Sequence, residues 1–146
     1  MTPEPADLLI VEDNPSDLEF TLRALKKCPK IHAIQTVKDG AEALDFIFCS
    51  GAYEERKGRN LPKVILLDLK LPKVNGIEVL KKLRADARTR PCPVVILTSS
   101  QEERDITESY RCGANSYIVK PVEFEKFVQA IGHISLYWLL HNKPPR

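Results

Sequence analysis

Four short apolar runs, separated by longer segments with helical periodicity, constrain the fold of this chain more than any other feature. Each run has the length of a strand and consists of aliphatic or aromatic side chains: residues 8–11, 64–67, 94–97 and 117–119. Continuous runs of this kind are expected where helices cover both faces of a parallel sheet. Residues 31–37 include polar side chains, and we expect them to form a more exposed strand.

The segments between these runs begin with helix start signals. An N-capping side chain before proline or glycine, or three residues before a glutamate, predicts a helix N-terminus. Such signals occur at Asn14-Pro15, Asp39-Gly40-Ala41-Glu42, Asn75-Gly76 and Ser100-Gln101-Glu102-Glu103. A last helix is predicted after Pro121, because apolar residues from Phe124 to Ile134 recur there at helical spacing.

Strict alternation of strands and helices requires crossover connections, and these produce a parallel sheet. We predict an α/β fold with a doubly wound parallel sheet of five strands and five helices, in a single domain over residues 1–146. The charged residues 50–60 are expected to form a solvated loop before the third strand.

Composition and charge disfavour several classes of protein. The net charge is +2, since 22 Lys and Arg are interleaved with 20 Asp and Glu, and this balance gives no basic surface for nucleic acid. The N-terminus lacks a signal-peptide pattern, and the apolar runs are too short to span a bilayer. The 4 cysteines form no Cys-x-x-Cys pair. We therefore expect a cytoplasmic protein with reduced thiols and without a nucleic-acid or membrane partner.

Side chains that can do chemistry stand at the ends of four predicted strands. They are Glu12 and Asp13 after the first strand, Asp68 after the third, Thr98 at the end of the fourth and Lys120 after the fifth. In an open parallel sheet, ligands bind beyond the carboxyl ends of the strands. Each residue alone has an ordinary explanation, such as a solvated strand end or a helix cap. Their joint placement indicates a site.

The types of these side chains favour phosphoryl transfer. Converging carboxylates repel one another unless a cation lies between them, and hard oxygen ligands suit Mg²⁺. Asp68 is placed as a nucleophile, while Lys120 and Thr98 can compensate the charge of a transferred phosphoryl group. The predicted cofactor is Mg²⁺.

With these residues in place, the chain resembles the receiver domains of two-component response regulators over about residues 7–135. The resemblance implies a flavodoxin-like strand order of 2-1-3-4-5. It also implies that Asp68, in the phrase Leu66-Leu67-Asp68-Leu69-Lys70-Leu71-Pro72, accepts a phosphoryl group from a histidine kinase. Asp13 would bind the metal directly, Glu12 through water, and Lys70 through its backbone carbonyl.

The resemblance further implies a conformational switch. Thr98 and Lys120 match the family's switch hydroxyl and lysine, Tyr117 matches the aromatic that swings inward, and Pro121 matches a cis-proline. The insertion at residues 50–61 and the ending Tyr137-Trp138-Leu139-Leu140 resemble the small response regulators paired with bacterial phytochromes. The implied partner is a sensor histidine kinase of that type.

Two alternatives differ in class from a receiver. A phosphatase of the haloacid dehalogenase type also uses a strand-end aspartate, but it needs a second acid two residues later, where this chain has Lys70. An interaction module that has lost phosphorylation would not need the strand-end residues, which are intact. We therefore expect a phosphoacceptor that assists its own phosphorylation and dephosphorylation, and not an enzyme acting on other substrates.

Three finer expectations follow. The Lys70 side chain should hinder water and slow hydrolysis of the phosphoryl group, and Ser100 is too short to orient that water. The helix at residues 102–111 has only Ile106 and Tyr110 as apolar anchors, so the surface formed by the fourth helix, fifth strand and fifth helix should report the switch. The apolar segment 136–146 should form a homodimer, or else fold back over its own sheet edge.

Overall fold

The computed structural model describes residues 8–28, 31, 33–56, 61–120 and 123–135. The elements are β1 Leu8–Val11, α1 Pro15–Leu25, β2 Ile34–Val37, α2 Gly40–Phe48, η1 Gly51–Arg56, β3 Val64–Leu67, α3 Gly76–Ala85, β4 Val94–Thr98, α4 Glu103–Arg111, β5 Ser116–Val119 and α5 Phe124–Ser135. All the strands pair in parallel, in the order β2-β1-β3-β4-β5. The predicted α/β fold and its flavodoxin-like order are confirmed.

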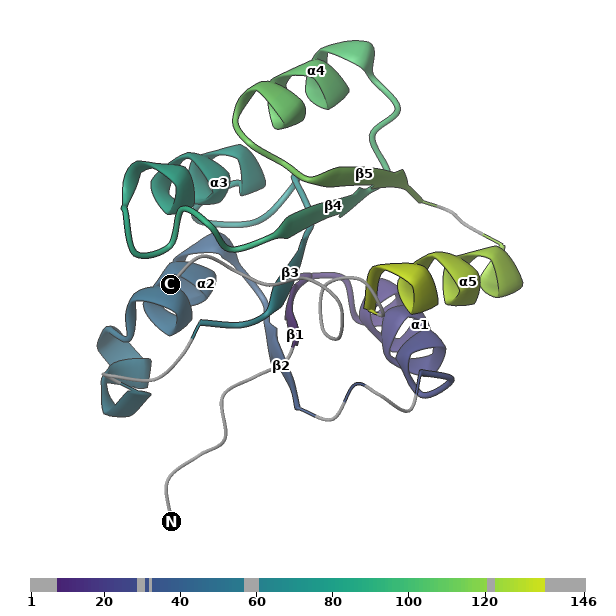
Figure 1. Ribbon diagram of the computed structural model, residues 1–146, viewed down its shortest axis with the longest axis horizontal. Coiled ribbons are helices and arrows are strands. Elements are labelled where there is room, and N and C mark those ends of the chain that lie inside the picture. Colours follow the sequence, from purple (N-terminus) through teal and green to yellow (C-terminus); the bar gives the residue numbers. More distant parts are fainter. Residues whose placement is uncertain (1–7, 29–30, 32, 57–60, 121–122, 136–146) are drawn as a thin grey trace.

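Two hydrophobic cores explain why the central strands are apolar at every position. Figure 1 shows α1 and α5 on one side of the sheet and α2 and α3 on the other. In β1, Leu9 and Val11 face the core under α2 and α3, whereas Leu8 and Ile10 face the core under α1 and α5. The residues of β3 and β4 alternate between the same two cores. Each central strand is therefore buried on both faces.

The strands at the two edges are less buried. The residues of β5 are all half-buried, and in β2 only Val37 is fully buried. The expectation of a more exposed second strand is confirmed, although the strand is shorter than residues 31–37. It begins at Ile34, where its pairing with Leu8 of β1 begins.

Side-chain caps fix the start of three helices as predicted. Asn14, Asp39 and Asn75 each accept a hydrogen bond from the backbone N–H three residues later, at 3.0, 2.7 and 3.0 Å. The predicted cap at Ser100 is wrong. Helix α4 begins after Glu102 without a side-chain cap, because the Ser100 hydroxyl lies in the preceding loop and donates to Asp105 at 2.5 Å.

Two further expectations about packing differ from the structure. Residues 51, 52, 54 and 55 are exposed to solvent as expected, but residues 51–56 form the 3₁₀ helix η1 and not an irregular loop. Tyr53 packs edge-on against Phe46 with ring centroids 5.1 Å apart. The Tyr53 hydroxyl also donates to Glu42 at 2.7 Å. In α4, Tyr110 is 49% exposed and does not anchor the helix, because the face turned inward carries the buried Ser109 and the half-buried Ile106.

Some expectations concern residues outside this description. Pro121 and the segment 136–146 lie beyond the described residues, so the cis-proline and the dimer contact stay predictions. Among the helices that are described, none is long and apolar enough to cross a membrane.

Candidate functional site

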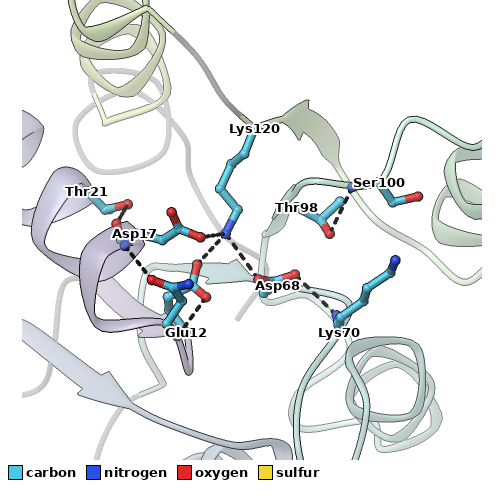
Figure 2. A network of polar contacts seen from close by, with 9 residues as sticks. Glu12, Asp17, Thr21, Asp68, Lys70, Thr98, Ser100 and Lys120 are labelled. Carbon is cyan, nitrogen blue, oxygen red and sulfur yellow. Dashed lines mark hydrogen bonds and ion pairs between the residues drawn. The ribbon is translucent and has the colours of Figure 1, made fainter.

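The carboxyl ends of four strands bring Glu12, Asp68, Thr98 and Lys120 together (Figure 2). Backbone hydrogen bonds extend the sheet ladder into these residues. The Glu12 N–H donates to the Val37 carbonyl at 3.0 Å, and the Asp68 N–H donates to the Val11 carbonyl at 3.2 Å. The Lys120 N–H donates to the carbonyl of Thr98 at 2.7 Å. These backbone hydrogen bonds to the sheet therefore fix the backbone positions of Glu12, Asp68 and Lys120.

The Lys120 ammonium lies among three carboxylates. Its Nζ is 2.6 Å from Glu12 Oε1, 2.9 Å from Asp17 Oδ2 and 3.1 Å from Asp68 Oδ2. The Lys120 side chain is 13% exposed, and those of Glu12 and Asp68 are 3% and 10% exposed. An ammonium has three N–H donors, so these contacts satisfy it fully. The lysine holds the acidic residues together across the ends of β1, β3 and β5.

Burial and charge shift the titration of both members of the closest pair. Burial raises the pKa of Glu12 to about 7 against the opposing hydrogen bond from Lys120, and the charge of Asp68 adds to the rise. Burial acts to lower the pKa of Lys120, but its hydrogen bonds to Glu12 and Asp17 and the charges of Asp68 and Glu12 raise it above its usual value. Lys120 therefore stays positively charged at neutral pH.

The same rim offers a donor set for a hard divalent cation. Glu12, Asp13 and Asp68 each present a carboxylate oxygen, and these oxygens lie within 4.8 Å of one another. Asp13 is exposed, whereas Glu12 and Asp68 are buried. Carboxylate oxygens grouped with one side open to solvent fit Mg²⁺, which keeps several of its waters. The residues present therefore fit the predicted ion.

The loop after Asp68 folds back over its carboxylate. The Lys70 N–H donates to Asp68 Oδ1 at 3.2 Å, and the Gly76 N–H donates to the Leu69 carbonyl at 2.8 Å. A Cβ added at Gly76 would overlap the carbonyl oxygen of Asp68. Lys70 is exposed, and Figure 2 shows it beside Asp68. A glycine at position 76 thus allows the loop to close tightly on the site.

Thr98 and Tyr117 meet at one loop residue that sequence reasoning did not single out as their link. The Thr98 hydroxyl, fully buried, accepts a hydrogen bond from the Ser100 N–H at 3.5 Å. The Tyr117 hydroxyl donates to the Ser100 carbonyl at 3.0 Å. Burial raises the pKa of Tyr117, so its hydroxyl remains a donor. Ser100 therefore connects the end of β4 with β5.

Asp17 is the site residue that the sequence analysis missed. It lies in the first turn of α1, and only the fold brings it to Lys120. One signal could have revealed it. Asp17 stands one helical turn after Asp13, and the N-terminus of a helix that follows a strand opens onto the strand's carboxyl end.

Similarity to known proteins agrees with this geometry. A family model described as the response regulator receiver domain matches residues 8–132. The chain is a response-regulator receiver. Receivers of this family are phosphoacceptors of two-component signalling that are phosphorylated by histidine kinases and bind Mg²⁺ at an acidic pocket, and they are not classical enzymes. The haloacid dehalogenase alternative is thereby excluded.

Two curated relatives show the breadth of the receivers that this chain resembles. The probable methanogenesis regulatory protein FilR2 of Methanothrix harundinacea is 38% identical over 97% of this chain and 89% of its own length. The response regulator Rcp1 of Synechocystis sp. is 34% identical over 92% of this chain and 90% of its own length.

Solved structures place the receiver near phytochrome-associated regulators. The bacteriophytochrome response regulator RtBRR is 50% identical, with a TM-score of 0.79 over 97% of this chain and 84% of that one. The phosphorylated cyanobacterial phytochrome response regulator RcpA is 34% identical, with a TM-score of 0.84 over 97% and 99% of the two chains. The Mn²⁺-bound form of Rcp1 has a TM-score of 0.82 at 32% identity, over 97% and 100%.

Proposed function

We propose that this receiver takes a phosphoryl group from a histidine kinase phosphohistidine onto Asp68, in a reaction that depends on Mg²⁺. The observation that carries the proposal is the position of Asp68, with its Oδ2 3.1 Å from the Lys120 ammonium and with oxygens of Glu12 and Asp13 nearby. A nucleophilic carboxylate, a cation and a metal donor set occur together. The phosphorylated form of RcpA, at 34% identity, supports the same chemistry.

In the proposed reaction, a carboxylate oxygen of Asp68 forms the new O–P bond. The P–N bond of the kinase's phosphohistidine breaks, and its electron pair leaves with the imidazole. Glu12, Asp13 and the backbone carbonyl of Lys70 would hold the Mg²⁺ together with Asp68. When bound, the ion neutralises oxygens of the phosphoryl group.

The remaining residues contact the phosphoryl group during its transfer and after it is attached. Lys120 already points its ammonium at Asp68, so it can donate to a phosphoryl oxygen without a large movement. The Thr98 hydroxyl lies at the end of β4 and can donate to another phosphoryl oxygen. Donors that are fixed before the reaction stabilise the developing charge most effectively.

The switch follows from the contacts of Ser100. If the Thr98 hydroxyl turns to the phosphoryl group, its contact with the Ser100 N–H changes, and Tyr117 holds the carbonyl of the same residue. A movement of Ser100 would then shift the start of α4, because the N–H of Glu102, the residue before the helix, donates to the Ser100 hydroxyl. Helix α4 has one buried residue, Ser109, and its hydroxyl has no hydrogen-bond partner, so the helix is weakly held.

The proposed kinase is a sensor of the bacterial phytochrome type. RtBRR, at 50% identity, is a bacteriophytochrome response regulator, and RcpA, at 34% identity, is a cyanobacterial phytochrome response regulator. We place the reaction in the cytoplasm, and we propose that residues 136–146 form a homodimer contact.

Two measurements test the proposed function against a receiver that has lost phosphorylation. Purified protein is incubated with acetyl phosphate and Mg²⁺, and bound phosphoryl groups are counted per chain. Beryllofluoride, which mimics an acyl phosphate, is titrated in parallel. We expect close to one group per chain and saturable beryllofluoride binding. Protein that takes up neither is an interaction module, and the proposal is then wrong.

A further inference from the structure

The carboxylate of Asp17 reaches the site from a helix, whereas the other partners of Lys120 come from strand ends. In Figure 2, Asp17 extends from α1 toward Lys120, and Asp68 approaches the same ammonium from another direction. The Asp17 side chain is 42% exposed, so it lies at the mouth of the site and not in its interior. No strand fixes its position.

Local hydrogen bonds hold the backbone of Asp17 in place. Its N–H donates to Asn14 Oδ1 at 3.0 Å, and its carbonyl accepts from the buried Thr21 hydroxyl at 3.1 Å. Because Asn14 already caps α1, the carboxylate of Asp17 is not needed as a cap. It is free to point at Lys120, and it does so.

Asp17 also differs in kind from the other two acids that contact the lysine. Glu12 and Asp68 belong to the group whose oxygens suit a divalent cation, and Asp17 does not. Oxygens of Glu12 and Asp68 must therefore serve both Lys120 and any bound cation. Asp17 is the partner of Lys120 that stays available when the other two are shared.

We propose that Asp17 is a positioning residue, which keeps the Lys120 ammonium directed at Asp68. The proposal rests on the proposed phosphorylation of Asp68. A lysine side chain has four flexible methylene groups and a strongly hydrated head, so an unanchored ammonium spends much of its time away from the site. An anchor on α1 leaves the remaining N–H donors for Asp68 and the oxygens of the phosphoryl group.

A competing explanation needs a separate prediction. An acidic residue in the first turn of a helix stabilises that helix through its dipole, wherever its side chain points. The helix-dipole effect needs the negative charge of Asp17 and does not involve Lys120. The positioning role needs only an acceptor oxygen at position 17, and it has no effect when Lys120 is absent. Asp17→Asn and a Lys120→Ala background therefore distinguish the two explanations.

The first experiment measures the rate of phosphorylation by acetyl phosphate at saturating Mg²⁺. We expect Asp17→Ala to lower the rate constant on the order of tenfold, as for the loss of a hydrogen bond to a charged group. Asp17→Asn keeps an acceptor oxygen and should restore most of the rate. Glu19→Ala removes a neighbouring charge that pairs with Arg23 on the exposed face of α1, and should leave the rate unchanged.

The second experiment needs neither metal nor phosphodonor. The protein is treated with an amine-acetylating reagent in metal-free buffer, and acetylation of Lys120 is followed by peptide mass spectrometry. We expect Asp17→Ala to raise the reactivity of Lys120 several-fold relative to the exposed Lys81, with Asp17→Asn and Glu19→Ala close to wild type. Thermal melting of each variant verifies that it is folded.

Different outcomes overturn different claims. The role of Asp17 is wrong if Asp17→Ala is phosphorylated as fast as wild type, or if it lowers the rate by the same factor in a Lys120→Ala background. Unchanged acetylation of Lys120 in Asp17→Ala would also overturn it. A wild-type protein that takes no phosphoryl group overturns the proposed function, and acetylation of Lys120 still tests the anchoring contact.

Discussion

The hydroxyl of Tyr117 donates a hydrogen bond to the backbone carbonyl of Ser100, and the oxygen atoms are 3.0 Å apart. This contact joins the edge strand β5 to the loop that leads into α4. The Ser100 N–H donates to the Thr98 hydroxyl, so Ser100 is hydrogen-bonded both to the end of β4 and to β5. The contact is therefore a direct connection between the proposed phosphorylation site and the surface that we expect to report it.

Tyr117→Phe removes this hydrogen bond and keeps the ring. We expect a loss of about 1 kcal/mol in the free energy of unfolding. We also expect beryllofluoride to cause a smaller change in amide exchange across Glu103–Arg111 than in wild type. Tyr110→Phe is the matched control, because Tyr110 is 49% exposed. Equal exchange responses in wild type and Tyr117→Phe would show that the contact does not carry the switch.

Lys70→Asn should speed loss of the phosphoryl group by several-fold. Lys70 is exposed and lies two residues after Asp68, where its long side chain can hinder an attacking water. Decay of the labelled protein is followed after removal of the phosphodonor. Lys81→Asn, an exposed lysine on α3, is the control and should decay as wild type. An unchanged or slower decay in Lys70→Asn contradicts the shielding role.

Gly76→Ala should damage both stability and phosphorylation. The new Cβ would overlap the carbonyl of Asp68, so the loop must shift, at a cost of roughly 1–3 kcal/mol as in other overpacked sites. Gly132→Ala in α5 is the contrasting control, since a Cβ there meets nothing within 4 Å. That variant should gain roughly 0.5–1 kcal/mol from helix propensity. Chemical denaturation measures the free energy of unfolding of both variants. A Gly76→Ala variant as stable as wild type would contradict the close approach of the loop to Asp68.

The segment 136–146 should hold a homodimer together. Residues 136–140 are apolar in succession, and so large an apolar set usually marks a contact with another protein surface. Trp138→Ala, or deletion of residues 136–146, should shift the protein from dimer to monomer in equilibrium sedimentation. If the wild-type protein is already monomeric at high micromolar concentration, the tail covers its own domain instead.

The sheet and most of the site could be predicted because both depend on short-range patterns. Leu8, Leu9, Ile10 and Val11 are apolar in succession because they alternate between two cores, and that pattern is specific for a covered parallel strand. Glu12 and Asp68 could then be placed from topology, because parallel strands end at one edge.

What the sequence did not reveal depends on contacts between distant residues. Asp17 is an ordinary first-turn acid until the fold brings the first turn of α1 to Lys120, 103 positions later in the sequence. Ser100 has the local signature of a cap, but its hydroxyl donates to the side chain of Asp105 in the first turn of α4. The charged segment forms η1, in which Tyr53 packs on Phe46 of α2. The residues around Tyr53 in the sequence show no pattern that predicts this contact.

Mapping the phosphoryl group to a residue tests the central claim most directly. The protein is incubated with acetyl phosphate or a cognate kinase, with Mg²⁺ or with a chelator, and the labelled peptide is located by mass spectrometry. We predict a label on Asp68 only, dependent on Mg²⁺, absent in Asp68→Asn and retained in Asp86→Asn, whose carboxylate is exposed. Asp13→Asn should need far more Mg²⁺. Undiminished labelling of Asp68→Asn, or labelling that the chelator does not reduce, would contradict the account.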